Sequence, residues 1–352
     1  MPELKKARLY ERLENRVARC LVCPRRCVLK EGQIGVCGTR MNREGEIYSL
    51  IYGMVSSVAI DPIEKKPLFH FYPGSPCLSF GSFGCNFRCI HCQNWSISHR
   101  MVERGIPDGR YVSPEEAVNI ALENGARGIS WTYNEPTIWH EYTLDSAKLA
   151  KKAGLYTVYV TNGYITLEAL EELSGCLDAF RVDLKGWDRE FWRKICKIDD
   201  PAPVFQSAYT AKNKWQMHVE VVTNVIPTFN DDEKTFRNLA TWIRDNLGPE
   251  CPWHITRFVP YLDLSYLSPT PLSTLERGRS IGLENGLKYV YLGNVPGHPA
   301  ENTYCPNCGS LLIERYGFWI KKSSLSPENS CPNCGQKINI VGSIETHKSL
   351  FF

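Results

Sequence analysis

The sequence has little net charge of either sign and no long apolar run. Its 41 Lys and Arg residues nearly balance 38 Asp and Glu residues, so the formal net charge is +3. A dedicated nucleic-acid binder concentrates basic residues, which makes nucleic acid a disfavoured partner here. No stretch approaches the roughly 18 consecutive apolar residues that a membrane-spanning helix requires, so no membrane partner is expected.

The N-terminal segment, MPELKKARLYERLENR, is charged throughout and lacks the apolar core of a signal peptide. We therefore expect a soluble, cytoplasmic protein. Leu4, Leu9, Leu13 and Val17 recur at spacings of four or five residues with charges between them, which predicts a helix over residues 1–19. The local excess of basic residues is interpreted as the solvated face of that helix, with an acidic partner as the weaker alternative.

Cysteine is abundant, with 15 residues in the chain. The cytosol keeps thiols reduced, so a disulfide framework is not expected. Eleven of the cysteines fall into three groups with the spacing of metal ligands, and metal binding accounts for them best. We interpret the other four as small buried apolar residues: Cys77, Cys176, Cys196 and Cys251.

The central group is the C-x3-C-x2-C pattern of Cys85, Cys89 and Cys92, within GCNFRCIHCQNW. Three thiolates in one short loop suit iron, and they leave one iron of a four-iron, four-sulfur (4Fe–4S) cluster without a protein ligand. A structural zinc or a purely electron-carrying cluster would require a fourth ligand. The spacing alone also allows ordinary buried thiols or part of a zinc knuckle.

The N-terminal group has four members, Cys20, Cys23, Cys27 and Cys37, separated by turns rich in glycine and proline. Four ligands imply a closed site, which suits either tetrahedral zinc or a second Fe–S cluster. The sequence does not separate the two metals. Residues 42–60 are predicted to form short strands with a Glu-Gly turn.

The C-terminal group follows a linker rich in proline and glycine. It comprises Cys305 and Cys308 in one CPNCG motif and Cys331 and Cys334 in a second. Two such knuckles are typical of a zinc ribbon or a rubredoxin-like site. We favour structural zinc, because metal can organise a segment too small to fold on an apolar core, and keep single iron as the alternative.

Between these groups, apolar strands alternate with amphipathic helices, which predicts a parallel β/α sheet or barrel. The predicted strands are CLSFGSF from 77, GISWTY from 128, LYTVYVT from 155, AFRVDLK from 179, MHVEVVTNVI from 217, WHITRFV from 253 and KYVYLG from 288. A helix is predicted from Ser113, with a Ser cap and Pro in the first turn. The predicted domains are 1–75 for the N-terminal helix and knuckle, 76–295 for the barrel and 296–352 for the C-terminal module.

Polar residues follow these strands in turn. They are Cys85, Cys89 and Cys92, then Asn134 and Glu135, then Thr161, Asn162 and Gly163, then Asp183 and Lys185, then Thr223 and Asn224, then Arg257, and finally Asn294. In β/α barrels the carboxyl ends of the strands build the active site. We therefore expect these side chains to share one site.

The combination of CPRRC, GCNFRCIHCQNW, WTYNEPT, VTNGY, RVDLKG and the terminal cysteine pairs resembles the radical S-adenosylmethionine (SAM) proteins. It is similar to pyruvate formate-lyase activating enzyme, and more closely to the radical SAM member of the AmmeMemoRadiSam system. The resemblance implies a partial barrel of the (β/α)6 type. It also implies a 4Fe–4S cluster on the three central cysteines, with SAM on the open iron.

The resemblance also suggests contacts for SAM. Glu135 is placed to accept from the methionyl ammonium group, although an acid before Pro136 also suits the start of a helix. Thr161 and Asn162 suit ribose or carboxylate, or form an ordinary turn. Asp183 and Lys185 share one face of a strand and suit the carboxylate and ribose of SAM, or form a plain salt bridge.

Two departures from the family pattern affect these contacts. Tyr133 and Asn134 replace the two glycines that usually precede the glutamate, which alters the expected backbone contacts. His91 replaces the usual aromatic residue before the third cysteine and still offers a flat face to adenine. Three further residues, His218, His254 and Arg257, are weaker candidates for the substrate cavity, and we interpret both histidines as structural.

We therefore predict a radical SAM oxidoreductase similar to activating enzymes. It would cleave SAM reductively and abstract hydrogen from a protein or small-molecule substrate. The implied partners are an electron donor such as ferredoxin or flavodoxin, and Memo-like and Amme-like proteins. Methyl or adenosyl transfer is a variant of this chemistry. The alternative is a non-catalytic, metal-dependent binding or electron-transfer protein that engages a partner or nucleic acid through its cysteine knuckles.

Overall fold

Seven parallel strands form the frame of the molecule. In the computed structural model, which describes residues 4–99 and 109–347, these strands are β9 (Pro76–Gly81), β11 (Gly128–Trp131), β12 (Tyr156–Thr161), β13 (Ala179–Asp183), β14 (His218–Val225), β15 (Trp253–Arg257) and β16 (Val290–Gly293). They lie side by side in chain order, and β8 (Ser57–Pro62) adds an antiparallel edge next to β9. The α/β fold and all seven predicted strands are confirmed, one parallel strand more than the resemblance implies.

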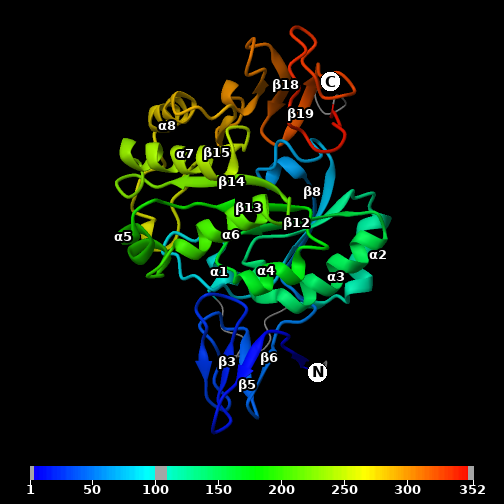
Figure 1. The fold of residues 1–352 in the computed structure, drawn as a ribbon, viewed down its shortest axis with the longest axis vertical. Helices are drawn as coiled ribbons and strands as arrows, with labels where there is room; N and C mark the ends of the chain where they lie inside the picture. The colour runs from blue at the N-terminus through cyan, green and yellow to red at the C-terminus, as the bar shows by residue number, and fades with distance from the viewer. Residues whose placement is uncertain (1–3, 100–108, 348–352) are drawn as a thin grey trace.

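Helices connect these strands and cover the outside of the sheet (Figure 1). They are α2 (Pro114–Glu123), α3 (His140–Lys152), α4 (Leu167–Leu173), α5 (Arg189–Phe191), α6 (Ala202–Asn213), α7 (Glu233–Leu247) and α8 (Leu272–Glu284), with the short α1 (Trp95–Ser98) after the central cysteines. The Ser113 side chain accepts a hydrogen bond from the Glu116 backbone N–H and caps α2 as predicted. Among the described helices, none has the length and apolar character needed to cross a bilayer.

The inner face of the sheet is polar at both ends. Alternate side chains of β14 point to this face because a strand repeats every two residues. His218 and Glu220 are buried near its start, and Val222 and Asn224 line a cavity near its end. The segment 63–75 contacts the buried end, where the Glu220 carboxylate accepts from the backbone N–H groups of Phe69 and His70.

The predicted helix over residues 1–19 is wrong for the part that the structure describes. The segment instead contributes β1 (Lys5–Lys6), β2 (Tyr10–Arg12) and the start of β3 (Ala18–Cys20). Asn15 and Arg16 both have φ of 57°, a left-handed conformation that turns the chain and cannot continue a helix. Antiparallel pairing of β2 with β3 therefore overrides the apolar spacing.

The rest of the N-terminal segment is also built from short strands. They are β4 (Val28–Leu29), β5 (Arg40–Arg43), β6 (Glu46–Ser49) and β7 (Met54–Val55), which pairs with β10 (Arg110–Tyr111). The predicted Glu-Gly turn joins β5 to β6, with both Glu44 and Gly45 at positive φ. In Figure 1, β3, β5 and β6 project from one end of the long axis.

The C-terminal segment lies at the opposite end of the long axis (Figure 1). Its strands are β17 (Thr303–Tyr304), β18 (Leu311–Tyr316) and β19 (Trp319–Ser323). Leu312, Ile313 and Ile320 share one buried apolar cluster with Tyr291 of β16 and with Phe69. The segment therefore packs on the β16 side of the main sheet.

Candidate active site

A cavity with a volume of about 360 Å³ lies at the carboxyl ends of the parallel strands. The polar strand-end residues predicted from the sequence line it, except Gly163 and Thr223. Thr223 lies on the other face of β14 and donates to the Leu184 carbonyl over 2.8 Å. Successive side chains of a strand point to opposite faces, so Thr223 points away from the cavity while its neighbour Asn224 lines it.

The three central cysteines all line this cavity. The Cys85 sulfur accepts from the Phe87 backbone N–H over 3.3 Å and from Asn162 Nδ2 over 3.7 Å. Within the described part of the chain, the sulfurs of Cys85, Cys89 and Cys92 are not gathered within 4.8 Å of one another. Thiols spread around an open space fit a multi-iron cluster better than one small ion, because each thiolate then binds its own iron.

Burial raises the pKa of Cys85 well above the ordinary thiol value, with Glu135 adding to the shift. The pKa of Cys89 is raised first by a hydrogen bond with Cys196 and then by burial. A thiolate in this environment needs a positive charge next to it. A bound metal cluster supplies that charge, so the donor set and its surroundings fit an Fe–S cluster.

Glu135 joins the ends of two strands. Its carboxylate accepts from Thr137 N–H at 3.0 Å, Thr161 Oγ1 at 2.7 Å and Asn162 N–H at 2.8 Å. The first of these bonds caps the short 3₁₀ helix Pro136–Trp139, as the helix-start interpretation predicts. Burial nevertheless raises its pKa. The carboxylate lines the cavity with one oxygen that accepts a single hydrogen bond, so it retains capacity for a ligand donor.

Asp183 lies between two cations. Lys185 Nζ is 2.6 Å from its Oδ2, and Arg181 pairs with its Oδ1. Burial favours the neutral acid, but Arg181 and then Lys185 outweigh it and lower the pKa of Asp183. The salt bridge is thus present, and Arg181 is a partner that the sequence analysis missed. All three side chains line the cavity, so the pair remains available to a ligand.

His91 lines the same cavity, and its Nδ1 is buried without a hydrogen-bond partner. Burial, with Lys185 adding to the effect, lowers its pKa to about 3 and keeps the ring neutral. A buried polar atom without a partner is rare in a folded protein. His91 therefore marks a place where a ligand can complete the structure.

Tyr133 and Asn134 hold the cysteine loop. Tyr133 has φ of 72°, a conformation that glycine adopts freely. Its carbonyl accepts from Asn94 Nδ2, and the Asn134 side chain bonds Ser82 N–H and the Gly84 carbonyl. The substitution of the two family glycines thus keeps a glycine-like backbone and adds side-chain bonds to the loop.

The weaker candidates separate into two groups. His218 and His254 both bond Glu220, at 2.9 and 2.7 Å, which confirms the structural interpretation of both. Arg257 lines the cavity, where its Nε donates to the Thr270 carbonyl. Phe318, in the turn between β18 and β19, also lines the cavity and was not predicted, because only the fold brings the C-terminal segment there.

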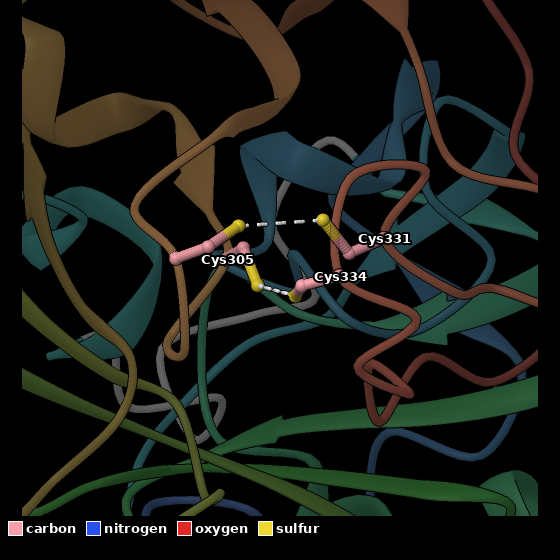
Figure 2. Close-up of side chains that lie close together, drawn as sticks. Cys305, Cys331 and Cys334 are labelled. Atoms are coloured by element: carbon pink, nitrogen blue, oxygen red, sulfur yellow. Dashed lines mark hydrogen bonds between the residues drawn. The ribbon is translucent and has the colours of Figure 1, made fainter.

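The four cysteines that we assigned to the protein interior are all buried: Cys77, Cys176, Cys196 and Cys251. The C-terminal four converge instead on one point (Figure 2). The sulfurs of Cys305 and Cys334 are 3.5 Å apart, and those of Cys308 and Cys331 are 3.7 Å apart. Four sulfurs at about 2.3 Å from one tetrahedral ion lie about 3.8 Å from each other, so this group fits one metal ion.

The comparisons with known proteins agree with this site. The profile of the radical SAM superfamily matches residues 80–240. An uncharacterized protein of Methanocaldococcus jannaschii is 47% identical over 339 residues, covering 96% of this chain and 100% of that protein. A putative glycyl-radical enzyme activating enzyme of the same organism is 26% identical over 189 residues, covering 51% of this chain and 66% of that enzyme.

Pyruvate formate-lyase 1-activating enzyme of Escherichia coli K12 is 24% identical over 237 residues, covering 62% of this chain and 93% of the enzyme. The matched profile begins in β9 and spans the three cysteines, Glu135 and Lys185. Cleavage of SAM and radical chemistry are general to the proteins that share it. The chain therefore carries a radical SAM domain at residues 80–240 and is homologous to glycyl-radical activating enzymes.

Proposed function

We propose that this protein is a radical SAM enzyme that cleaves SAM reductively and abstracts hydrogen from a substrate held in the cavity. The observation that carries the proposal is the single cavity that joins Cys85, Cys89 and Cys92 to the polar strand ends. When bound, a 4Fe–4S cluster and SAM supply a 5′-deoxyadenosyl radical. The protein holds and orients these groups.

The side chains divide the binding of SAM between them. Lys185 keeps ammonium donors beyond its bond to Asp183 and would hold the methionyl carboxylate. Glu135 would accept from the methionyl ammonium at the oxygen that has a single partner. Thr161 and Asn162 lie beside it for the ribose. The neutral His91 ring would face adenine, with Nδ1 available to a polar group of the ligand.

The substrate end is the side of the cavity formed by Asn224, Arg257, Asn294 and Phe318. Homology to activating enzymes favours a protein substrate, with a small molecule as the alternative, and it calls for a reductant such as ferredoxin or flavodoxin. We further propose Memo-like and Amme-like proteins as associates. We expect coelution with either one, or a change in SAM turnover on its addition. If both effects are absent, that association is excluded.

The test is SAM cleavage by anaerobically reconstituted protein reduced with dithionite. We expect 5′-deoxyadenosine from the wild type and none above background from Cys89→Ala. Cys176→Ala is the matched control, because Cys176 is buried like Cys89 but does not line the cavity, and it should retain product formation. A wild type with a loaded cluster that neither binds nor cleaves SAM would favour the non-catalytic alternative.

A further inference from the structure

The N-terminal cysteines surround a second, smaller cavity. Cys20, Cys23, Cys27 and Cys37 all line it, and the rest of its wall includes the apolar side chains of Val22, Leu29 and Ile138. Cys20 ends β3, and its backbone N–H bonds the Cys27 carbonyl over 3.0 Å. The four thiols therefore face one enclosed space although their positions span the β3–β5 region of the chain.

The spacing of these sulfurs differs from that of the C-terminal group. The four C-terminal sulfurs all lie within 4.8 Å of one another, as one ion requires. Neither the N-terminal four nor the three central cysteines form such a group among the residues that the structure describes. A 4Fe–4S cluster takes one thiolate on each iron, so its ligands lie around a larger body and not around a point. In neither of these two groups, therefore, are the sulfurs gathered around one point.

One residue that lines the cavity also has a polar atom without a hydrogen-bond partner. Arg40 is buried and lines the cavity, and its two terminal nitrogens bond Glu141 at 3.1 and 2.7 Å. Its Nε is buried without a hydrogen-bond partner. Cluster sulfides and thiolates accept such N–H donors, and these bonds help to set the reduction potential. A bound anionic cluster would complete the hydrogen bonding of Arg40.

We propose that Cys20, Cys23, Cys27 and Cys37 hold a second 4Fe–4S cluster, and not zinc. Its ligand loop contacts the active-site loop: a Cβ added at Gly84 would lie 2.4 Å from the Cys37 carbonyl oxygen. Arg88 joins the same loops by donating to the carbonyls of Val36 and Cys85. The site places a one-electron carrier next to the cysteine loop of the active site.

The first test removes the central ligands. In the full-length Cys85→Ala, Cys89→Ala, Cys92→Ala variant, reconstituted anaerobically, we expect about four irons and about four acid-labile sulfides per chain to remain. Dithionite should produce an electron paramagnetic resonance signal that SAM does not alter. Sulfide is the decisive quantity, because neither zinc nor a single iron at the C-terminal site contributes any. Absence of sulfide, or a second zinc per chain, would overturn the proposal.

The second test locates the remaining cluster. Adding Cys27→Ser to the triple variant should remove most of the sulfide, while Cys251→Ser, a change at a buried cysteine outside every group, should leave it in place. The metal of the C-terminal site reports that the chain is folded. Sulfide unaffected by Cys27→Ser would place the cluster elsewhere. The triple variant lacks the proposed SAM site, so these results are independent of the SAM cleavage assay on the wild type.

Discussion

The two ends of the barrel interior are both polar, yet the carboxylate at the centre of one end is fully hydrogen-bonded, whereas the other end is an open cavity. At the amino ends of the strands, the Glu220 carboxylate accepts four hydrogen bonds, from His218, His254 and the backbone of Phe69 and His70. At the carboxyl ends, a cavity of about 360 Å³ is lined by three thiols and by His91, whose Nδ1 has no partner.

The presence or absence of hydrogen-bond partners therefore distinguishes structural residues from ligand-binding residues better than polarity alone. A buried carboxylate with all its lone pairs occupied stabilises the fold and has little capacity left for a ligand. Donors and acceptors that face an open cavity without partners are available for binding. The amino ends of the strands, around Glu220, form the closed end of the barrel, and the carboxyl ends, around the cavity, form the open end. His218 and His254 at the closed end and His91 at the open end illustrate both cases.

Removing the charge at the closed end should have the largest effect on stability. Glu220→Gln turns an amide N–H toward groups that are themselves donors, so we expect the free energy of unfolding to fall by about 3 kcal/mol or more. Chemical denaturation measures it, and Glu190→Gln on the surface should leave it nearly unchanged. SAM cleavage per folded molecule should be unchanged. Lost cleavage in a stable variant would contradict the division between the two ends.

Acid should destabilise the closed end through His70. Its Nδ1 bonds the Asn339 carbonyl and its Nε2 bonds Tyr291 Oη, and burial lowers its pKa from 6.5 to about 4. The unfolded chain takes up the proton first, so stability is full above pH 6.5 and is lost as the pH falls towards 4, by up to about 3 kcal/mol. Denaturation across this range should show the loss, and His70→Gln should reduce the slope. An equal slope in the variant would show that other groups cause it.

At the open end, removing one cation should weaken SAM binding without unfolding the protein. We expect Lys185→Gln to raise the dissociation constant of SAM by about 10-fold to 100-fold, the size of a lost bond to a charged group. Equilibrium binding of SAM to the reconstituted protein measures it. The control is Lys151→Gln, which removes a partner of Asp178, and neither of these residues lines the cavity. Equal affinities for SAM in the wild type and both variants would show that Lys185 does not contribute to SAM binding.

Much of the open end could be predicted from the sequence, because β/α alternation places strand ends together whatever the details of packing. Asn134, Asp183 and Asn294 were found in this way. The pairing of Asp183 with Arg181 and the approach of Phe318 were not, since they depend on side-chain direction and on contacts distant in sequence. The prediction of an N-terminal helix was wrong for a local reason. The chain makes a left-handed turn at Asn15 and Arg16, which the spacing of apolar residues does not reveal.

The smallest effect is expected at Tyr133. Its left-handed backbone costs roughly 1–2 kcal/mol, and its hydroxyl donates to Asp61 over 3.1 Å. Tyr133→Gly removes the backbone strain and also the hydrogen bond to Asp61. The two effects oppose each other, so the free energy of unfolding should change by less than about 1 kcal/mol. Tyr133→Ala keeps the strain and should be less stable than Tyr133→Gly. The reverse order in thermal unfolding would show that the side chain, and not the backbone, decides this position.

We propose that SAM binds at the open end directly to a cluster held by Cys85, Cys89 and Cys92. The most direct test is the electron paramagnetic resonance spectrum of the dithionite-reduced wild type before and after SAM is added, with Cys89→Ala beside it. We predict that SAM changes part of the wild-type signal and leaves the variant spectrum unchanged. A fully loaded wild-type protein whose spectrum does not respond to saturating SAM would show that SAM does not bind at this cluster.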